Sequence, residues 1–113
     1  MGYSKPDSKL KTYKSMCHHN KVKNVYADIL DYSYFRSKII NFKPQIIFHL
    51  AAQSLVSESY KFPLETVASN IMGSTNILNI SREVKSLNSL VIVTSDKCYL
   101  NRELTRGYRE SDT

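Results

Sequence analysis

Short apolar runs that alternate with stretches of helical periodicity constrain this chain more than any other feature. Three runs rich in β-branched and aromatic residues lie near residues 23–27, 45–50 and 89–95. Runs of this length and composition predict β-strands. The middle run shows little alternation of apolar and polar side chains, which is expected for a strand covered on both faces of a parallel sheet.

Two further stretches carry apolar side chains at every third or fourth position, which predicts helices near residues 31–41 and 64–84. Asp31 or Ser33 can cap the first helix, and Pro63 suits the first turn of the second. Strand, helix, strand, helix and strand form a βαβαβ unit. Because crossovers between parallel strands are right-handed, the predicted fold class is α/β, with a doubly wound parallel sheet.

The net charge of +6 is concentrated at the start of the chain. Residues 1–24 hold six Lys and one Asp, and the remainder is nearly neutral. We therefore divide the sequence into a basic leader, residues 1–22, and one domain, residues 23–113. We interpret the leader as a solvated arm, and contact with nucleic acid phosphates is the alternative.

The composition also bounds the setting in which the protein works. A chain of 113 residues buries roughly two-thirds of the surface that its unfolded form exposes, so its core needs neither disulfides nor metals. The longest uncharged run, residues 66–81, is shorter than the ~20 residues of a membrane span, and no signal peptide is recognisable. Cys17 and Cys98 form no CxxC pair, which indicates reduced thiols and a cytoplasmic protein.

Candidate functional residues follow the expected strands, because ligands of doubly wound sheets bind beyond the carboxyl ends. Those ends carry Asp28-Ile29, Leu50-Ala51-Ala52-Gln53 and Thr94-Ser95-Asp96-Lys97. Each also has a structural interpretation: a turn or capping Asp, alanines that allow close packing, and an exposed Asp-Lys turn. The three His residues lack the spacing of metal ligands, so we interpret His49 as a core residue and predict no metal site.

Three segments together resemble the extended short-chain dehydrogenase/reductase family: Ile47–Gln53, Ser69–Thr75 and Val93–Tyr99. Residues 28–31 are similar to that family's third-strand corner, and residues 2–4 to the end of its second strand. The resemblance implies an incomplete, Rossmann-like NAD-binding domain over residues 23–113. It implies NAD contacts from Asp28, Ile29, Leu50, Ala51, Ala52, Gln53, Ser69, Asn70 and Thr94.

More narrowly, Thr94-Ser-Asp-Lys-Cys-Tyr99 and Gly107-Tyr-Arg-Glu110 are similar to the CDP-glucose 4,6-dehydratases. That resemblance implies a lyase that converts CDP-glucose to CDP-4-keto-6-deoxyglucose through transient reduction of NAD. By position, Ser95 would hydrogen-bond the C4 hydroxyl, Asp96 would protonate the departing C6 hydroxyl, and Lys97 would stand in place of the base at C5. These roles need a raised pKa for Asp96 and a lowered pKa for Lys97, whereas adjacent opposite charges act the other way; burial has to outweigh them.

Two elements of that family are missing from the sequence: the Gly-rich turn that binds pyrophosphate, and a Tyr-x-x-x-Lys pair after the last motif. Tyr34 and Lys38 have the spacing of the pair but precede the Ala51-Ala52 segment, so we interpret them as helix surface. We expect the chain to be an internal fragment of such an enzyme. Its partners are then the nucleotide sugar and either flanking segments of a split gene product or further copies in a homo-oligomer, with no membrane contact.

Three other interpretations stay open. The chain can be a degenerate remnant or a small binding protein without catalysis. It can be a fragment of a nucleotide-sugar epimerase. It can also be a basic nucleic-acid-binding module, for which residues 1–22 are the only support.

We predict that the 113 residues alone bind NAD weakly or not at all and do not convert CDP-glucose. The turn that binds pyrophosphate and the Tyr base are both missing, and losing one member of a cooperating catalytic set removes most of the rate enhancement. Calorimetric titration with NAD and an assay for the 4-keto-6-deoxy product measure these properties. A micromolar dissociation constant, or turnover by the isolated chain, would contradict the prediction.

Overall fold

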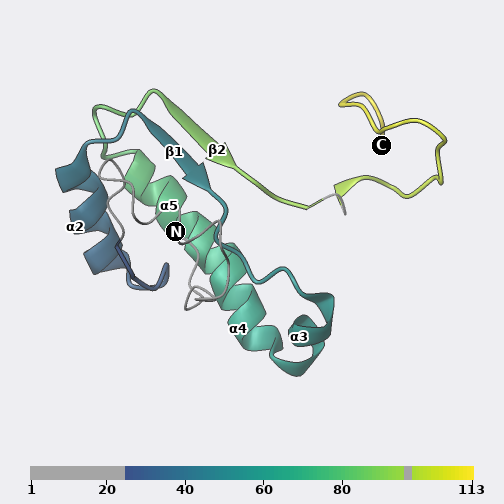
Figure 1. Ribbon diagram of the computed structural model, residues 1–113, viewed down its shortest axis with the longest axis horizontal. Coiled ribbons are helices and arrows are strands. Elements are labelled where there is room, and N and C mark those ends of the chain that lie inside the picture. Colours follow the sequence, from purple (N-terminus) through teal and green to yellow (C-terminus); the bar gives the residue numbers. More distant parts are fainter. Residues whose placement is uncertain (1–24, 96–97) are drawn as a thin grey trace, which may run out of the picture.

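The computed structural model describes residues 25–95 and 98–113. Its elements run in the order α2 (Tyr32–Phe42), β1 (Ile46–His49), α3 (Val56–Lys61), α4 (Pro63–Val67), η1 (Ala68–Met72), α5 (Gly73–Ser81) and β2 (Ser89–Ile92). β1 and β2 pair in parallel, with Ile46 beside Ser89 and His49 beside Ile92. Figure 1 shows α2 and α5 lying alongside this two-stranded sheet. The predicted α/β class and the parallel pairing of the second and third runs are confirmed.

The two predicted helices are present with shifted ends. Asp31 caps α2, because its Oδ1 accepts a hydrogen bond from the backbone N–H of Tyr34 at 3.1 Å. α4, η1 and α5 follow one another without a break from Pro63 to Ser81, so the second helix ends three residues earlier than expected. η1 is a π-helical turn in which the N–H of Gly73 donates to the carbonyl of Ala68. α3 was not predicted; it buries no residue, so it has no apolar periodicity to detect.

The expected strand at residues 23–27 is wrong over its described part. Residues 25–27 form no strand, and residues 23 and 24 lie outside the described part of the chain. A strand is defined by the neighbour with which it exchanges backbone hydrogen bonds. Among the described residues only β1 and β2 pair with each other, so the β-prone side chains at 25–27 have no such neighbour.

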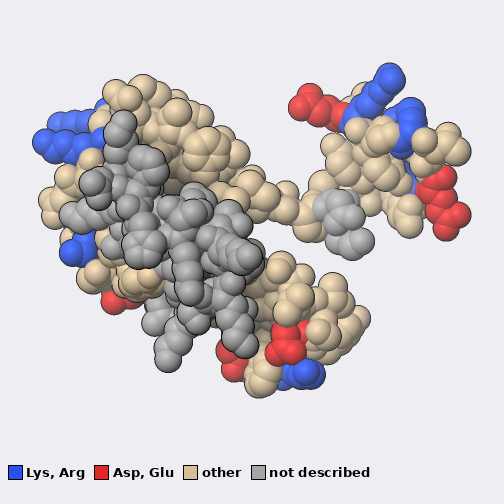
Figure 2. All heavy atoms as spheres, viewed as in Figure 1, with Lys and Arg blue, Asp and Glu red and all other residues tan. Residues whose placement is uncertain are grey.

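The expectation that the middle strand is covered on both faces is also wrong for the described residues. Ile47 and His49 face the helices, whereas Ile46 and Phe48 on the opposite face are 54% and 61% exposed. Val93, directly after β2, is 54% exposed. In Figure 2 charged side chains gather on α2, on α3 and α4, and on residues 98–113. The sheet thus has an apolar outer face that no described helix covers.

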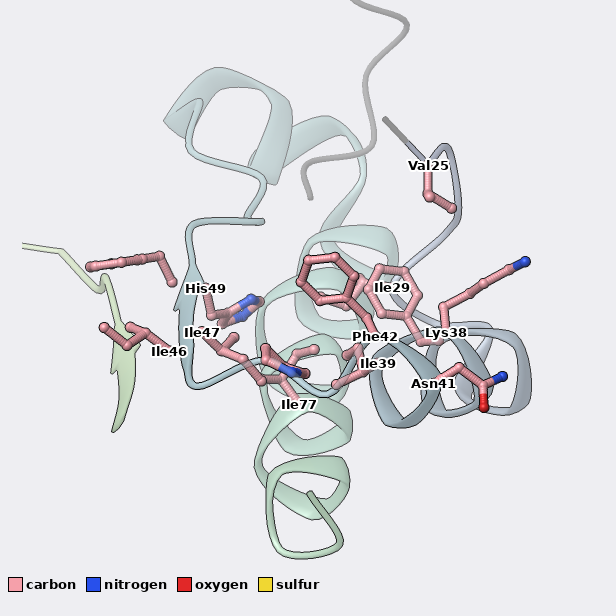
Figure 3. A pocket seen from close by; sticks show the side chains of 13 residues that line it. Val25, Ile29, Lys38, Ile39, Asn41, Phe42, Ile46, Ile47, His49 and Ile77 are labelled. Carbon is pink, nitrogen blue, oxygen red and sulfur yellow. The ribbon is translucent and has the colours of Figure 1, made fainter. Parts of the chain in front are cut away.

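An open cavity of about 630 Å³ lies between α2 and β1. Figure 3 shows side chains of β1 on one side of it and side chains of α2 and of residues 25–29 on the other. Most of its lining is apolar, including Ile29, Phe42, Ile46 and Ile47. Of the residues predicted to bind a cofactor, only Ile29 lines it. The cavity is therefore distinct from the predicted cofactor edge.

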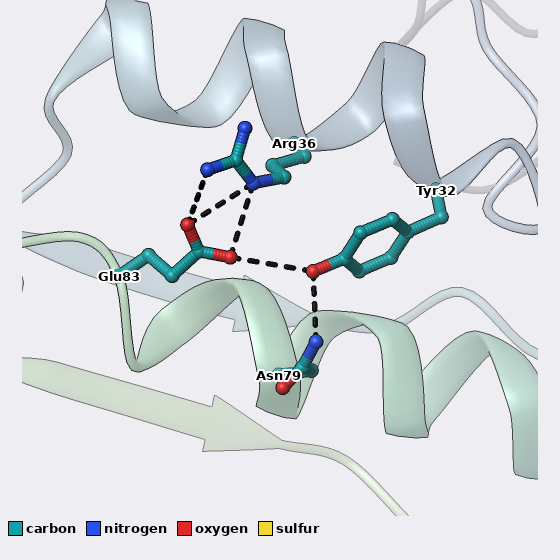
Figure 4. Close-up of polar contacts among 4 residues, drawn as sticks. All are labelled: Tyr32, Arg36, Asn79 and Glu83. Atoms are coloured by element: carbon teal, nitrogen blue, oxygen red, sulfur yellow. Dashed lines mark hydrogen bonds and ion pairs between the residues drawn. The ribbon is translucent and has the colours of Figure 1, made fainter.

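A small core joins the helices to the inner face of the sheet. Its buried members are Ile29, Phe35, Ala51, Ile77, Ile80 and Val84. At the surface, α2 is tied to the end of α5 by charged and polar groups drawn in Figure 4: Arg36 Nε lies 3.0 Å from both carboxylate oxygens of Glu83, and Tyr32 Oη donates to Glu83 Oε1 at 3.3 Å. The Arg36 guanidinium holds the pKa of the Glu83 carboxyl below its usual range. These contacts join α2 at the surface to the segment that follows α5.

Residues 98–113 contain no helix longer than a turn and no strand. Their ends are joined by the Leu100 N–H, which donates to the Thr113 carbonyl at 2.9 Å. Inside the loop, Tyr99 and Tyr108 stack with ring centroids 5.1 Å apart, and Arg106 forms two 2.8 Å hydrogen bonds with Asp112. Among the described residues, no helix has the length and apolar character that a bilayer crossing requires.

Gly73→Ala is predicted to lower the free energy of unfolding by about 1–3 kcal/mol, less a helix-propensity gain of up to ~1 kcal/mol. A Cβ at position 73 would lie 2.8 Å from Cγ2 of Ile29, which is 4% exposed and has little room to move. Gly107→Ala is the control, because a Cβ there meets nothing within 4 Å. Urea unfolding of the two variants measures the difference. Equal stabilities would show that the packing of Ile29 on α5 is looser than described.

Candidate functional site

The carboxyl ends of β1 and β2 meet at one edge of the sheet. The ladder continues just past both strands, where the N–H of Val93 donates to the carbonyl of His49 at 3.0 Å. The two predicted segments, residues 50–53 and 94–95, therefore begin at the same end of the sheet. Leu50, Ala52, Thr94 and Ser95 are exposed there, while Ala51 is buried. Asp96 and Lys97 lie outside the described residues.

One side chain, Asn70 of η1, holds the segment after β1 in place. Its Oδ1 accepts from the backbone N–H of Gln53 at 2.7 Å, and its Nδ2 donates to the backbone carbonyl of the same residue at 3.0 Å. The amide thus satisfies both backbone groups of Gln53, as a neighbouring strand would. Because all these atoms are partly buried, losing the amide would leave a donor and an acceptor unpaired.

The side chain of Gln53 is turned back onto its own loop. Its Oε1 accepts from the N–H of Leu55 at 2.5 Å, and its Nε2 donates to the Leu55 carbonyl at 2.9 Å and to Thr66 Oγ1 at 3.3 Å. These bonds link the loop to α4, the start of the long helix that α4, η1 and α5 form together. The Gln53 side chain therefore fixes the loop after β1, which lies at the carboxyl end of the sheet.

His49 is buried at the end of β1, as expected for a core histidine, with 4% of its surface exposed. The hydroxyl of Ser74 donates to the carbonyl of Asn70 at 2.7 Å, and Ser74 Oγ lies 3.1 Å from His49 Nε2. Since the Ser74 proton is committed to that carbonyl, Nε2 has to be the donor in the second bond. Burial lowers the pKa of His49 from its usual value of 6.5, which favours the neutral ring.

Asp28 and Ile29 lie at the turn before α2, and Ile29 belongs to the same buried core as Ala51. Asp28 is exposed, and its Oδ1 accepts from the N–H of Leu30 at 2.9 Å, which closes a turn. Ile29 is buried against Gly73, and its carbonyl accepts from Asn76 Nδ2 at 3.0 Å. The same helix that holds Gln53 therefore also holds this corner.

Sequence reasoning found some of these residues and missed others. Asn70 was identified through the family resemblance, but Ser74 and Asn76, which bond to the sheet and to the turn, were not. The available signal was polar side chains in an otherwise apolar helix. Ser69, which the resemblance also identified, lies half-buried on η1 beside Asn70.

The remaining sequence expectations concern metals and the Tyr34–Lys38 pair. The part of the chain that the structure describes holds no cluster of three or more His, Cys, Asp or Glu suited to a metal ion. Tyr34 and Lys38 lie on the exposed side of α2, with Lys38 Nζ 5.1 Å from the centre of the Tyr34 ring. Their interpretation as helix surface is confirmed.

Comparison with known proteins gives one consistent relationship. A sequence profile described as GDP-mannose 4,6 dehydratase matches residues 4–111. The CDP-glucose 4,6-dehydratase of Salmonella typhimurium is 47% identical over 86 residues, which are 76% of this chain and 24% of that protein. The UDP-glucose 4-epimerase of Mycoplasma genitalium is 30% identical over 74 residues, 66% of this chain and 22% of that protein.

Comparison of the fold with solved structures points to similar proteins. The crystal structure of a UDP-glucose-4-epimerase from Stenotrophomonas maltophila, with bound NAD and formylated UDP-arabinopyranose, superposes with a TM-score of 0.68 at 29% identity. That match covers 79% of this chain and 26% of the other. The chain thus spans about a quarter of the length of the relatives it matches.

Asn70→Ala is predicted to lower the free energy of unfolding by about 1–3 kcal/mol relative to Asn79→Ala. Both changes gain the same helix propensity, but Asn79 makes one exposed bond to Tyr32 Oη, whereas Asn70 pairs two backbone groups of Gln53. Urea unfolding measures both. If the two variants are equally stable, Asn70 does not hold the loop.

Stability is predicted to fall as the pH drops below 6.5. A folded-state pKa below the unfolded value means that the unfolded chain binds more protons, so stability is lost as the pH falls through the folded pKa of His49. The slope reaches at most about 1.4 kcal/mol per pH unit. His49→Gln removes the titration but keeps an N–H donor, so its stability should change less over this range. Parallel slopes for the two proteins would refute the assignment.

Proposed function

The chain belongs to the GDP-mannose 4,6-dehydratase family, and from this membership we propose that it is part of an enzyme that removes water from a nucleotide-linked hexose. The observation that carries the choice of substrate is the 47% identity to a CDP-glucose 4,6-dehydratase, against 30% to the epimerase from Mycoplasma. The proposed reaction converts CDP-glucose to CDP-4-keto-6-deoxyglucose. Because this chain corresponds to about a quarter of such an enzyme, other segments have to complete the site.

We assign the proton chemistry to the residues that follow β2. Ser95 hydrogen-bonds the C4 hydroxyl, Asp96 gives its proton to the departing C6 hydroxyl, and Lys97 takes the proton from C5. In this assignment Asp96 is protonated and Lys97 neutral when the sugar binds, so water has to be excluded from the pair. Thr94 and Ser95 are exposed, so a substrate can reach the segment that leads to the pair, and further segments or the sugar itself have to exclude water from it.

The cofactor proposed for this reaction is NAD, which when bound accepts a hydride from C4 and later returns it to C6. The described residues fit part of it. Asp28 offers an exposed carboxylate and Thr94 an exposed hydroxyl, while the short side chains of Ala51 and Ala52 leave the backbone approachable. No Gly-rich turn for the pyrophosphate occurs in the sequence, so another segment has to provide it.

The other proposed cofactor residues form two groups: those whose side chains are open to a ligand, and those whose side chains are already bonded or packed within the protein. Leu50 is 63% exposed and free to contact a ligand, and Ser69 lies half-buried on η1. In contrast, Ile29, Gln53 and Asn70 are engaged within the protein. We propose that these three act by positioning the loops at the carboxyl ends of the strands.

We also propose a cytoplasmic location, which rests on the two cysteines.

An epimerase is the second candidate, favoured by the structural match to the UDP-glucose-4-epimerase. The two reactions differ after C4 oxidation, because only the dehydratase needs an acid for the C6 hydroxyl. The Ser95-Asp96-Lys97 string supplies an acid and a base there, which supports the dehydratase. An assay with CDP-glucose and UDP-glucose side by side separates the two: one activity gives a 4-keto-6-deoxy sugar and the other a C4 epimer.

We predict the effect of Asp96→Asn in a chimera in which this chain replaces the matching segment of the Salmonella enzyme. The variant should reduce NAD but release almost no 4-keto-6-deoxy product, because an amide cannot deliver a proton to the departing hydroxyl. NADH absorbance and product are followed together. Glu65→Gln on the exposed surface of α4 is the control and should leave both signals unchanged. Normal product formation by Asp96→Asn would place the acid elsewhere.

A further inference from the structure

The loop of residues 98–113 is held together by its own contacts. Figure 1 shows it beyond β2 and apart from the helices. The Leu100 N–H donates to the Thr113 carbonyl, which brings the two ends of the loop together. A compact loop with joined ends, packed by its own side chains, is an Ω-loop, and loops of this kind are frequently functional. The conformation of residues 98–113 therefore depends on side chains inside the loop.

Tyr108 makes contacts with three residues at the start of the loop. Its ring stacks on Tyr99, with centroids 5.1 Å apart and ring planes at 16°. Its hydroxyl accepts from the backbone N–H of Arg102 at 2.8 Å and donates to Asn101 Oδ1 at 3.3 Å. One side chain thus joins the second half of the loop to the first by a ring contact and by two hydrogen bonds.

The turn that Tyr108 contacts has a backbone conformation that needs support. Glu103 has a φ of 50°, in the left-handed region that side chains other than Gly rarely adopt. Its N–H donates to Asn101 Oδ1 at 3.0 Å, and the same oxygen accepts from the Tyr108 hydroxyl. Tyr108 and Asn101 together therefore stabilise a conformation that the turn would not favour by itself.

The position of these contacts in the sequence connects them with the proposed chemistry. Cys98 follows Asp96 and Lys97 directly, and Tyr99 is the next residue. Tyr99 is half-buried, although Cys98 before it is exposed. Because the ring of Tyr108 lies on Tyr99, it acts on the chain two residues after Lys97.

We propose that Tyr108 is a positioning residue, which through Tyr99 and residues 101–102 fixes the chain that directly follows Lys97. This inference rests on the proposed function, in which Asp96 and Lys97 carry the proton transfers of the elimination. A displacement of about 1 Å in a reacting group can lower a rate by about 100-fold. Tyr108 would thus affect the elimination step without touching the sugar.

The first test measures the positioning itself in the 113-residue chain, without turnover. Tyr108→Phe keeps the stacked ring but removes the hydroxyl, so amide hydrogen exchange at Arg102 should become about three to ten times faster by NMR. Tyr60→Phe is the matched control, because Tyr60 is 84% exposed on α3, and exchange at Arg102 should not change. Unchanged exchange at Arg102 in Tyr108→Phe would overturn the proposal.

The second test measures the effect on the reaction in the chimera with the Salmonella enzyme. Tyr108→Leu removes both the ring and the hydroxyl, so product formation should fall by about tenfold or more while NADH still accumulates. The ratio of NADH to 4-keto-6-deoxy product should therefore rise. Loss of folded protein alone would lower both signals together and leave their ratio unchanged. Tyr108→Phe keeps the ring stack, and its ratio should lie between those of the wild type and Tyr108→Leu.

Tyr60→Leu is the control for the second test and should leave the ratio unchanged. A ratio unchanged by Tyr108→Leu, or raised as much by Tyr60→Leu, would overturn the positioning role. A chimera that forms no 4-keto-6-deoxy sugar would instead refute the dehydratase. The exchange at Arg102 then decides by itself whether Tyr108 holds this part of the chain.

Discussion

The pair of hydrogen bonds between Asn70 and the backbone of Gln53 is the contact on which the arrangement of the sheet edge depends. It joins the helix over the sheet to the loop that follows β1. Four residues further along, Ser74 bonds to the buried His49 at the end of the same strand. Helix and strand are thus bonded at two successive points, and the loop between them has little freedom to change its path.

The π-helical turn gives this contact a specific place in the helix. In η1 the backbone is wider than in an α-helix, and such turns are frequent at functional sites. Asn70 lies within this turn, opposite the end of β1. Beyond it the helix returns to α geometry, where Gly73 allows Ile29 to pack closely and Asn76 bonds to its carbonyl. One helix therefore fixes two separate chain segments that follow β-prone runs.

Local order was predictable from the sequence, whereas order that depends on distant partners was not. α2, the long helix and the two paired strands follow from periodicity and from short-range signals such as the Asp31 cap. The expected strand is absent at residues 25–27 because a β-strand needs a neighbouring strand, and periodicity does not indicate whether that neighbour is present. The same limit applies to the site: the sequence indicated that residues 50–53 and 94–95 lie at strand ends, but not that Gln53 folds back on Leu55.

The residues whose environment was predicted wrongly share one property. Their side chains suit surroundings that the described part of the chain does not supply. Ile46 and Phe48 are apolar like the buried face of their strand, yet they are more than half exposed. Leaving more than half of each side chain in water forfeits a corresponding part of the about 1.5–3 kcal/mol that full burial of such a side chain contributes. A sequence that keeps them is better explained by a larger sheet, in which both faces of β1 are covered. The site divides in the same way. Asn70, Ser74 and Asn76 find their partners within this chain. Leu50 and Thr94 instead face outward, where further segments or a ligand can lie against them.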